Sequence, residues 1–182
     1  MRKELVSWFA MLLCIIVSDS CCVLFYPRMD DGEVPMSIEH IIVENEILAI
    51  IIRHDHSQPG IQFVTPHEFS QQLAYMNHPA GKVIEPHVHN IVHRDVTYTQ
   101  EVLLIKRGKL RVDFYKSNRQ YLESRILNAG DVILLASAGH GFEALEEIEM
   151  IEVKQGPYME HDDKLKFHGI SSSEVSWGKS ES

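Results

Sequence analysis

Residues 81–108 read GKVIEPHVHNIVHRDVTYTQEVLLIKRG, and the interpretation of the whole chain depends on the spacing within this stretch. His87 and His89 stand two residues apart, and Glu101 opens the apolar run that follows them. Successive side chains of a β-strand point to opposite faces, so both imidazoles would lie on one face. A hairpin that joins this strand to the next would bring the carboxylate beside the two rings. Such a ligand set suits iron, manganese, nickel or zinc.

A second segment provides the candidate for a fourth metal ligand. Gly130 and Asp131 form a turn before an apolar run at 132–136, and His140 follows shortly after that run ends. Closure of a barrel would place His140 opposite the other three ligands. The alternative is a barrel that holds no ion, in which these histidines bond to backbone groups or water.

Short apolar stretches separated by Gly, Pro, Asn and Asp predict an all-β fold with short helical turns. We expect strands at 48–53, 101–106, 109–116, 120–127, 132–136 and 148–154. In the third of these, Leu110, Val112 and Phe114 alternate with polar or amphipathic residues, which predicts one buried face and one face exposed to water.

The motif residues resemble those of the cupin superfamily: Gly81, five residues, His87-Val88-His89, Glu101, six residues and Gly108, then Gly130, Asp131, Gly139 and His140. The resemblance implies a double-stranded β-helix, or jelly-roll barrel, with a divalent metal ion at His87, His89, Glu101 and His140. Residues 36–168 also resemble small cupin metalloproteins associated with bacterial polysaccharide synthesis. Gly108 and Gly130 are expected to occupy turns with positive φ.

This chain departs from the cupin pattern at two places. Eleven residues separate His89 from Glu101, more than is usual in the family, so 90–100 are expected to form an extended hairpin or lid. In the second motif Ala136 replaces the usual proline, and His140 lies one residue closer to Gly130 than in the family pattern.

Several other polar side chains are candidates for a role in the site. Tyr75 is the candidate catalytic residue, as a donor or part of a proton relay, and Tyr98 and Gln100 are weaker candidates for the same role. His93 lies in the long connection before Glu101 and is expected at the surface. The second His-x-His, at 54–56, is followed by Ser-Gln-Pro-Gly and is expected in a solvated turn.

The domain organisation is predicted as an apolar extension at 1–35, a cupin barrel at 36–158 and a polar tail at 159–182, disordered at its end. The apolar run at 5–17 follows Arg2 and Lys3 and is too short to span a bilayer comfortably. It has three readings: a cleaved secretory signal, a short anchor, or an extension upstream of a later start at Met29 or Met36. All three cysteines fall within the first 22 residues, which favours a cytoplasmic protein, with export or anchoring through 5–17 as the alternative.

The expected function is that of a small metal-dependent enzyme, an isomerase, epimerase or oxygenase, that acts on a polar, sugar-like metabolite. The alternative is a cupin that binds or senses such a small molecule without converting it. The net charge of −9 repels phosphate backbones and anionic lipid surfaces, so we expect no nucleic-acid partner, and a membrane only if the extension is genuine. A homodimer is expected because such barrels commonly pair through edge strands.

Overall fold

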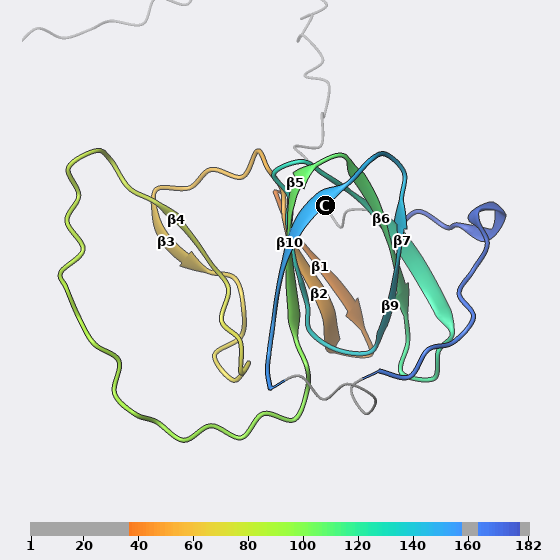
Figure 1. Cartoon of the computed structure of the whole chain (residues 1–182), viewed down its shortest axis with the longest axis horizontal. Helices are drawn as coiled ribbons and strands as arrows, with labels where there is room; N and C mark the ends of the chain where they lie inside the picture. The colour runs from red at the N-terminus through yellow and green to blue at the C-terminus, as the bar shows by residue number, and fades with distance from the viewer. Residues whose placement is uncertain (1–36, 158–163, 179–182) are drawn as a thin grey trace, which may run out of the picture. The chain divides into compact units, whose positions relative to one another are not determined.

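Two antiparallel sheets enclose the main apolar cluster of the chain (Figure 1). This computed structural model describes residues 37–157 and 164–178. The five-stranded sheet has the order β1 (Ile38–Val43), β2 (Glu46–Ile52), β8 (Val132–Leu135), β5 (Glu101–Arg107) and β10 (Glu149–Lys154), and the three-stranded sheet has the order β7 (Tyr121–Asn128), β6 (Lys109–Tyr115) and β9 (Gly139–Ala144). A separate hairpin pairs β3 (Gly60–Phe63) with β4 (Ala74–Asn77). The predicted all-β class is therefore confirmed.

The five-stranded sheet is apolar on both of its faces. Along β2, Ala49 and Ile51 enter the cluster between the sheets, whereas Ile50 and Ile52 enter a second cluster on the opposite face. Each aliphatic side chain that is fully buried stabilises the fold by about 1.5–3 kcal/mol. The continuous apolar run of this strand follows from burial on both sides.

The six expected strands are all present, each within one or two residues of the predicted bounds. Neither large sheet closes on itself, because each ends in two edge strands within the described residues. Gly108 and Gly130 adopt positive φ values of 85° and 91°, as expected for the turns they occupy. A methyl group at Gly108 would overlap the carbonyl oxygen of Glu147, so this turn also needs the absence of a side chain.

One prediction about β6 is wrong. The face that carries Arg111, Asp113 and Tyr115 was expected to be exposed, but all three residues are at most 5% exposed. The cover comes from the C-terminal tail, whose residues 164–178 include the 3₁₀ turn η1 (Ser172–Glu174). Polar alternation in β6 therefore marks a face that is buried with its hydrogen bonds satisfied.

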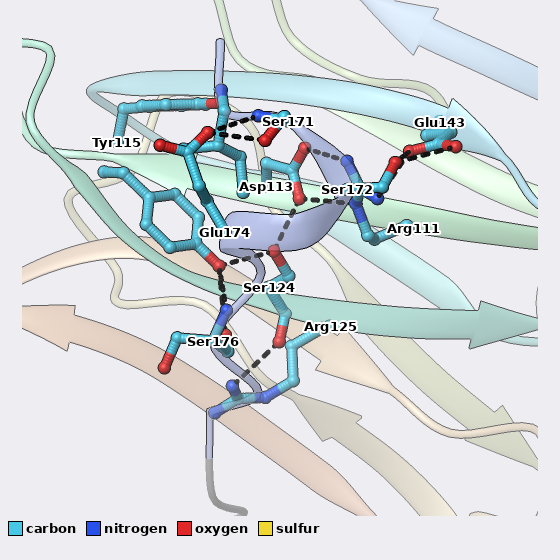
Figure 2. A network of polar contacts seen from close by, with 12 residues as sticks. Arg111, Asp113, Tyr115, Ser124, Arg125, Glu143, Ser171, Ser172, Glu174 and Ser176 are labelled. Carbon is cyan, nitrogen blue, oxygen red and sulfur yellow. Dashed lines mark hydrogen bonds and ion pairs between the residues drawn. The ribbon is translucent and has the colours of Figure 1, made fainter.

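The tail is held on this face by a chain of hydrogen bonds (Figure 2). The Tyr115 hydroxyl accepts a bond from the Ile170 amide at 3.1 Å, and the Tyr121 hydroxyl accepts one from the Ser176 amide at 2.9 Å. Arg111 donates to Asp113 through two nitrogens, at 2.8 and 3.0 Å. The tail thereby covers the edge of β7, where Ser124 forms a parallel bridge with Trp177.

A buried carboxylate organises the turn between β7 and β8. Asp131 is fully buried and accepts hydrogen bonds from the amides of His54 and Asn128, at 2.8 and 2.9 Å, and from Arg53, at 2.9 Å. Arg53 also donates to Glu39 of β1 at 2.6 Å. Burial by itself raises the pKa of Asp131, but these hydrogen bonds outweigh burial and lower it below its ordinary value of 3.8.

Residues 1–36, and with them the predictions about the apolar run and the start of the chain, lie outside the described residues. In the part that is described, no helix has the length and apolar character needed to cross a membrane.

The substitution Asp131→Asn should lower the free energy of unfolding by about 2–4 kcal/mol, because it removes one of the two carboxylates that pair with Arg53 and replaces an acceptor by a donor at one oxygen position. Urea denaturation followed by circular dichroism measures this loss. The matched control is Asp55→Asn at an exposed position nearby, which should change the same quantity by no more than about 0.5 kcal/mol.

The stabilisation by Asp131 should also depend on pH. Its pKa is lower in the folded chain than in the unfolded chain, so its contribution is complete above the unfolded value and is lost as the pH falls through the folded value. The difference in unfolding free energy between wild type and Asp131→Asn should therefore shrink as the pH is lowered from about 5 to about 2. A difference that stays constant over this range would contradict the assignment.

Candidate functional site

Two of the four predicted metal ligands lie side by side. Glu101 is the first residue of β5, on the inner face of the five-stranded sheet, and His140 lies on β9 of the other sheet. The Nε2 atom of His140 is 3.2 Å from Oε2 of Glu101. The facing arrangement of the sheets thus brings together residues that are far apart in the sequence.

The Glu101 carboxylate is buried and held in its charged form. The hydrogen bond from His140 is the main cause that lowers the pKa of Glu101 to about 2, and it outweighs the opposing effect of burial. The positive charge of Lys164 contributes in the same direction, with its Nζ 3.3 Å from Oε1. Glu101 is therefore a carboxylate throughout the physiological range of pH, the form in which it binds metal ions.

A cavity of about 910 Å³ opens beside this pair. Its lining comes from β5, β6 and β9, from the tail, and from the end of the connection before β5. It contains as many basic as acidic side chains, together with aromatic rings: Arg111, Lys164 and Lys166; Glu101, Asp113 and Glu143; Tyr98, Tyr115, Phe142 and Phe167. This volume is large enough for a small-molecule ligand.

His87 and His89 lie in a different part of the chain. Their rings contact each other edge to face, with centroids 5.2 Å apart, in the connection between β4 and β5. Every residue from Pro79 to Thr99 is exposed, and the hairpin expected between the His87 strand and the Glu101 strand is not formed. Within the described residues, no three His, Cys, Asp or Glu side chains are gathered in a group suited to hold a metal ion. The chain thus presents the predicted ligands as two separate pairs.

The other candidate residues lie at three places. Tyr75 belongs to β4, where its ring contacts His56 edge to face and packs against the outer cluster of the five-stranded sheet. Tyr98 lines the cavity that contains Glu101 and His140. Gln100 is buried, accepts a hydrogen bond from the Gln71 amide and anchors the start of β5.

The other candidate histidines are His93, in the connection before β5, and the pair at 54–56. His93 pairs with Asp95 at the surface of the connection, as predicted. The expected solvated turn at 54–56 is only partly correct. His54 is exposed, but His56 is buried between the Ser37 hydroxyl and the Gln62 side chain.

No protein-family model matches this chain, and neither does any curated protein or solved structure. The likeness to the cupins therefore rests on the motif residues and on the pairing of Glu101 with His140.

Sequence reasoning missed the residues of the tail that complete the cavity. Lys164 and Phe167 belong to a segment without apolar periodicity, and Lys164 pairs with a residue much earlier in the chain. The buried polar alternation of β6 was the one signal available, because an Arg and an Asp two residues apart on one strand face can pair with each other and then accept a cover.

The substitution His140→Ala should raise the pKa of Glu101 from about 2 toward its ordinary value of 4.5, because it removes the largest contribution to the lowering. An NMR titration of the ¹³C-labelled glutamate carboxyl groups measures this change. The comparison is Lys164→Gln, which should raise the pKa of Glu101 by a smaller amount. Equal pKa values in His140→Ala and wild type would show that this contact does not form in solution.

Proposed function

We propose that this chain is a cupin-type protein that binds a divalent metal ion through His87, His89, Glu101 and His140, and that it is a small enzyme acting on a polar, sugar-like metabolite. The observation that carries the proposal is the contact between Glu101 and His140, both of which line a cavity. In the sequence these two residues belong to separate motifs, and the fold places them together.

Glu101 and His140 have the chemistry to bind the metal that the resemblance implies, and they supply two of its four expected ligands. Glu101 is buried and ionised, and the Nε2 atom of His140 lies 3.2 Å from its Oε2, so two ligands of the right chemical kind are adjacent, and a metal ion would replace the hydrogen-bonding proton between them. The remaining two donors, His87 and His89, are neighbours in a second pair. A bound divalent ion would act as a Lewis acid on a carbonyl or hydroxyl group of the substrate.

The lining of the cavity supports a neutral, polyhydroxylated ligand. Its acidic and basic side chains balance, which disfavours a strongly charged molecule, and both kinds form hydrogen bonds with hydroxyl groups. Aromatic rings such as Tyr98 and Phe142 offer apolar faces on which a sugar ring can lie. Tyr98 would bind and orient the ligand.

The alternative function is binding without conversion. It is supported by the position of Tyr75, which packs against His56 on the outer face of the five-stranded sheet rather than lining the cavity. In the described part of the cavity, Tyr98 is then the leading candidate for proton transfer. Incubation with unlabelled monosaccharides, followed by ¹H NMR, separates the two functions, because an enzyme changes the spectrum of the sugar with time and a binding protein only broadens it.

Elemental analysis of the full chain, purified without a histidine tag, tests metal binding. Wild type should retain close to one metal ion per chain, and the variants His87→Ala/His89→Ala and Glu101→Gln/His140→Ala should each lose at least about tenfold in affinity. The matched control, His40→Ala/His67→Ala, removes two exposed histidines elsewhere and should keep the metal. A wild-type metal content no greater than that of the double variants would overturn the proposal.

A further inference from the structure

The segment from Pro79 to Thr99 extends from the fold without packing against the rest of its own chain. None of its 21 residues is buried, and it forms no strand or helix. It leaves β4 and runs away from both large sheets before it returns to β5 (Figure 1). Both ends are nevertheless anchored, since Tyr75 packs against the outer apolar cluster and Gln100 is buried.

This segment is rich in β-branched apolar residues, which is typical of a strand that packs against another part of a protein. Its exposed apolar residues include Val83, Ile84, Val88 and Ile91, and Val88 is 90% exposed. Exposed apolar residues gathered on one segment in this way mark a surface that binds another protein. Pro86 lacks an amide hydrogen, which is compatible with a strand that pairs along one side only.

Of the two strands that carry the Glu101–His140 pair, β9 lies at a sheet edge, whereas β5 is separated from the edge of its sheet by one strand. His140 is on β9, which pairs only with β6 in the described structure, and β5 is followed in its sheet by β10, the last strand. Side chains on both faces of β10 are exposed, among them Met150 and Ile151. An edge strand presents unpaired amide and carbonyl groups, and these bind a further strand.

We infer that residues 79–99 of each chain cross to a second copy of the same chain, pair there with β9, and deliver His87 and His89 to the Glu101 and His140 of that copy. The metal site is then shared between two subunits, and each subunit supplies half of the ligands to each of two sites. The metal part of this inference rests on the proposed function, whereas the exchange of the segment does not.

A second copy is the occupant that fits the exposed parts of the chain. The segment carries the two imidazoles that the Glu101–His140 pair lacks, and every chain carries both halves, so a two-fold dimer satisfies both reciprocally. The number of exposed residues is close to the roughly 20–30 that each partner contributes to a stable interface. The β3–β4 hairpin, which directly precedes the segment, adds the exposed apolar residues Ile61, Phe63 and Met76 to the same surface.

A complementation experiment with Zn²⁺ tests the shared site. His87→Ala/His89→Ala chains and Glu101→Gln/His140→Ala chains are mixed in equal amounts, unfolded and refolded together, and titrated with a zinc indicator. Random pairing with exchange restores about one quarter of the wild-type sites, because about half of the dimers are mixed and each of these has one intact site. No recovery above either variant alone, while wild type binds zinc, would overturn the inference.

A disulfide experiment tests the exchange without metal. In the full chain with Cys14, Cys21 and Cys22 replaced by serine, Val88→Cys and Gly141→Cys are introduced together, since both positions would lie on the face opposite the histidines. Oxidation should yield a covalent dimer on a non-reducing gel only when both cysteines are present. A disulfide within one chain, or none, would overturn the inference. If wild type binds no zinc but the covalent dimer forms, the proposed function fails and the exchange stands.

Discussion

The Asp131 carboxylate is buried at the turn from β7 to β8 and accepts hydrogen bonds from Asn128 of that turn and from Arg53 and His54 just after β2, so the junction between these strands depends on it. Through Arg53 it is connected to Glu39 of β1, and Glu39 in turn accepts a bond from Arg125 of β7. These contacts join one sheet to the other. A buried charge of this kind is tolerated only when every partner is in place, so the network specifies one arrangement of the sheets.

The geometry of the candidate site follows from this arrangement. The turn at Asp131 begins β8, and β8 pairs with β5 in a register that sets Glu101 opposite Leu135. On the other sheet, β9 pairs with β6 so that His140 lies opposite Phe114, whose ring is part of the core. Glu101 and His140 therefore face each other because their strands are fixed by packing that neither residue takes part in.

Local patterns in the sequence were sufficient for six strands, whereas β1, β3, β4 and β9 were not predicted. The apolar run at β2 reflects burial on both of its faces, and the turns at Gly108 and Gly130 reflect backbone conformations that glycine adopts easily. The pairing of Glu101 with His140 was also predicted, although from the cupin motifs rather than from periodicity.

The features that the sequence did not reveal are those that depend on distant partners. The cover over Arg111 and Asp113 comes from the tail, where Ser172 and Glu174 carry no apolar pattern to indicate where they bind. Lys164 approaches Glu101 through an ion pair that leaves no periodic trace. The path of the segment with His87 is set by neither propensity nor local pattern, because each of its side chains faces solvent in the single chain.

The parallel bridge between Ser124 and Trp177 has a consequence for how far self-association can go. It occupies the outer side of β7, so the three-stranded sheet, as far as the described residues show, is open only at β9. A sheet with two unpaired edge strands can add further strands at both edges and grow into a filament. A sheet with one unpaired edge strand stops growing when that edge is paired. In this chain the tail therefore confines any strand addition to the three-stranded sheet to the side of β9.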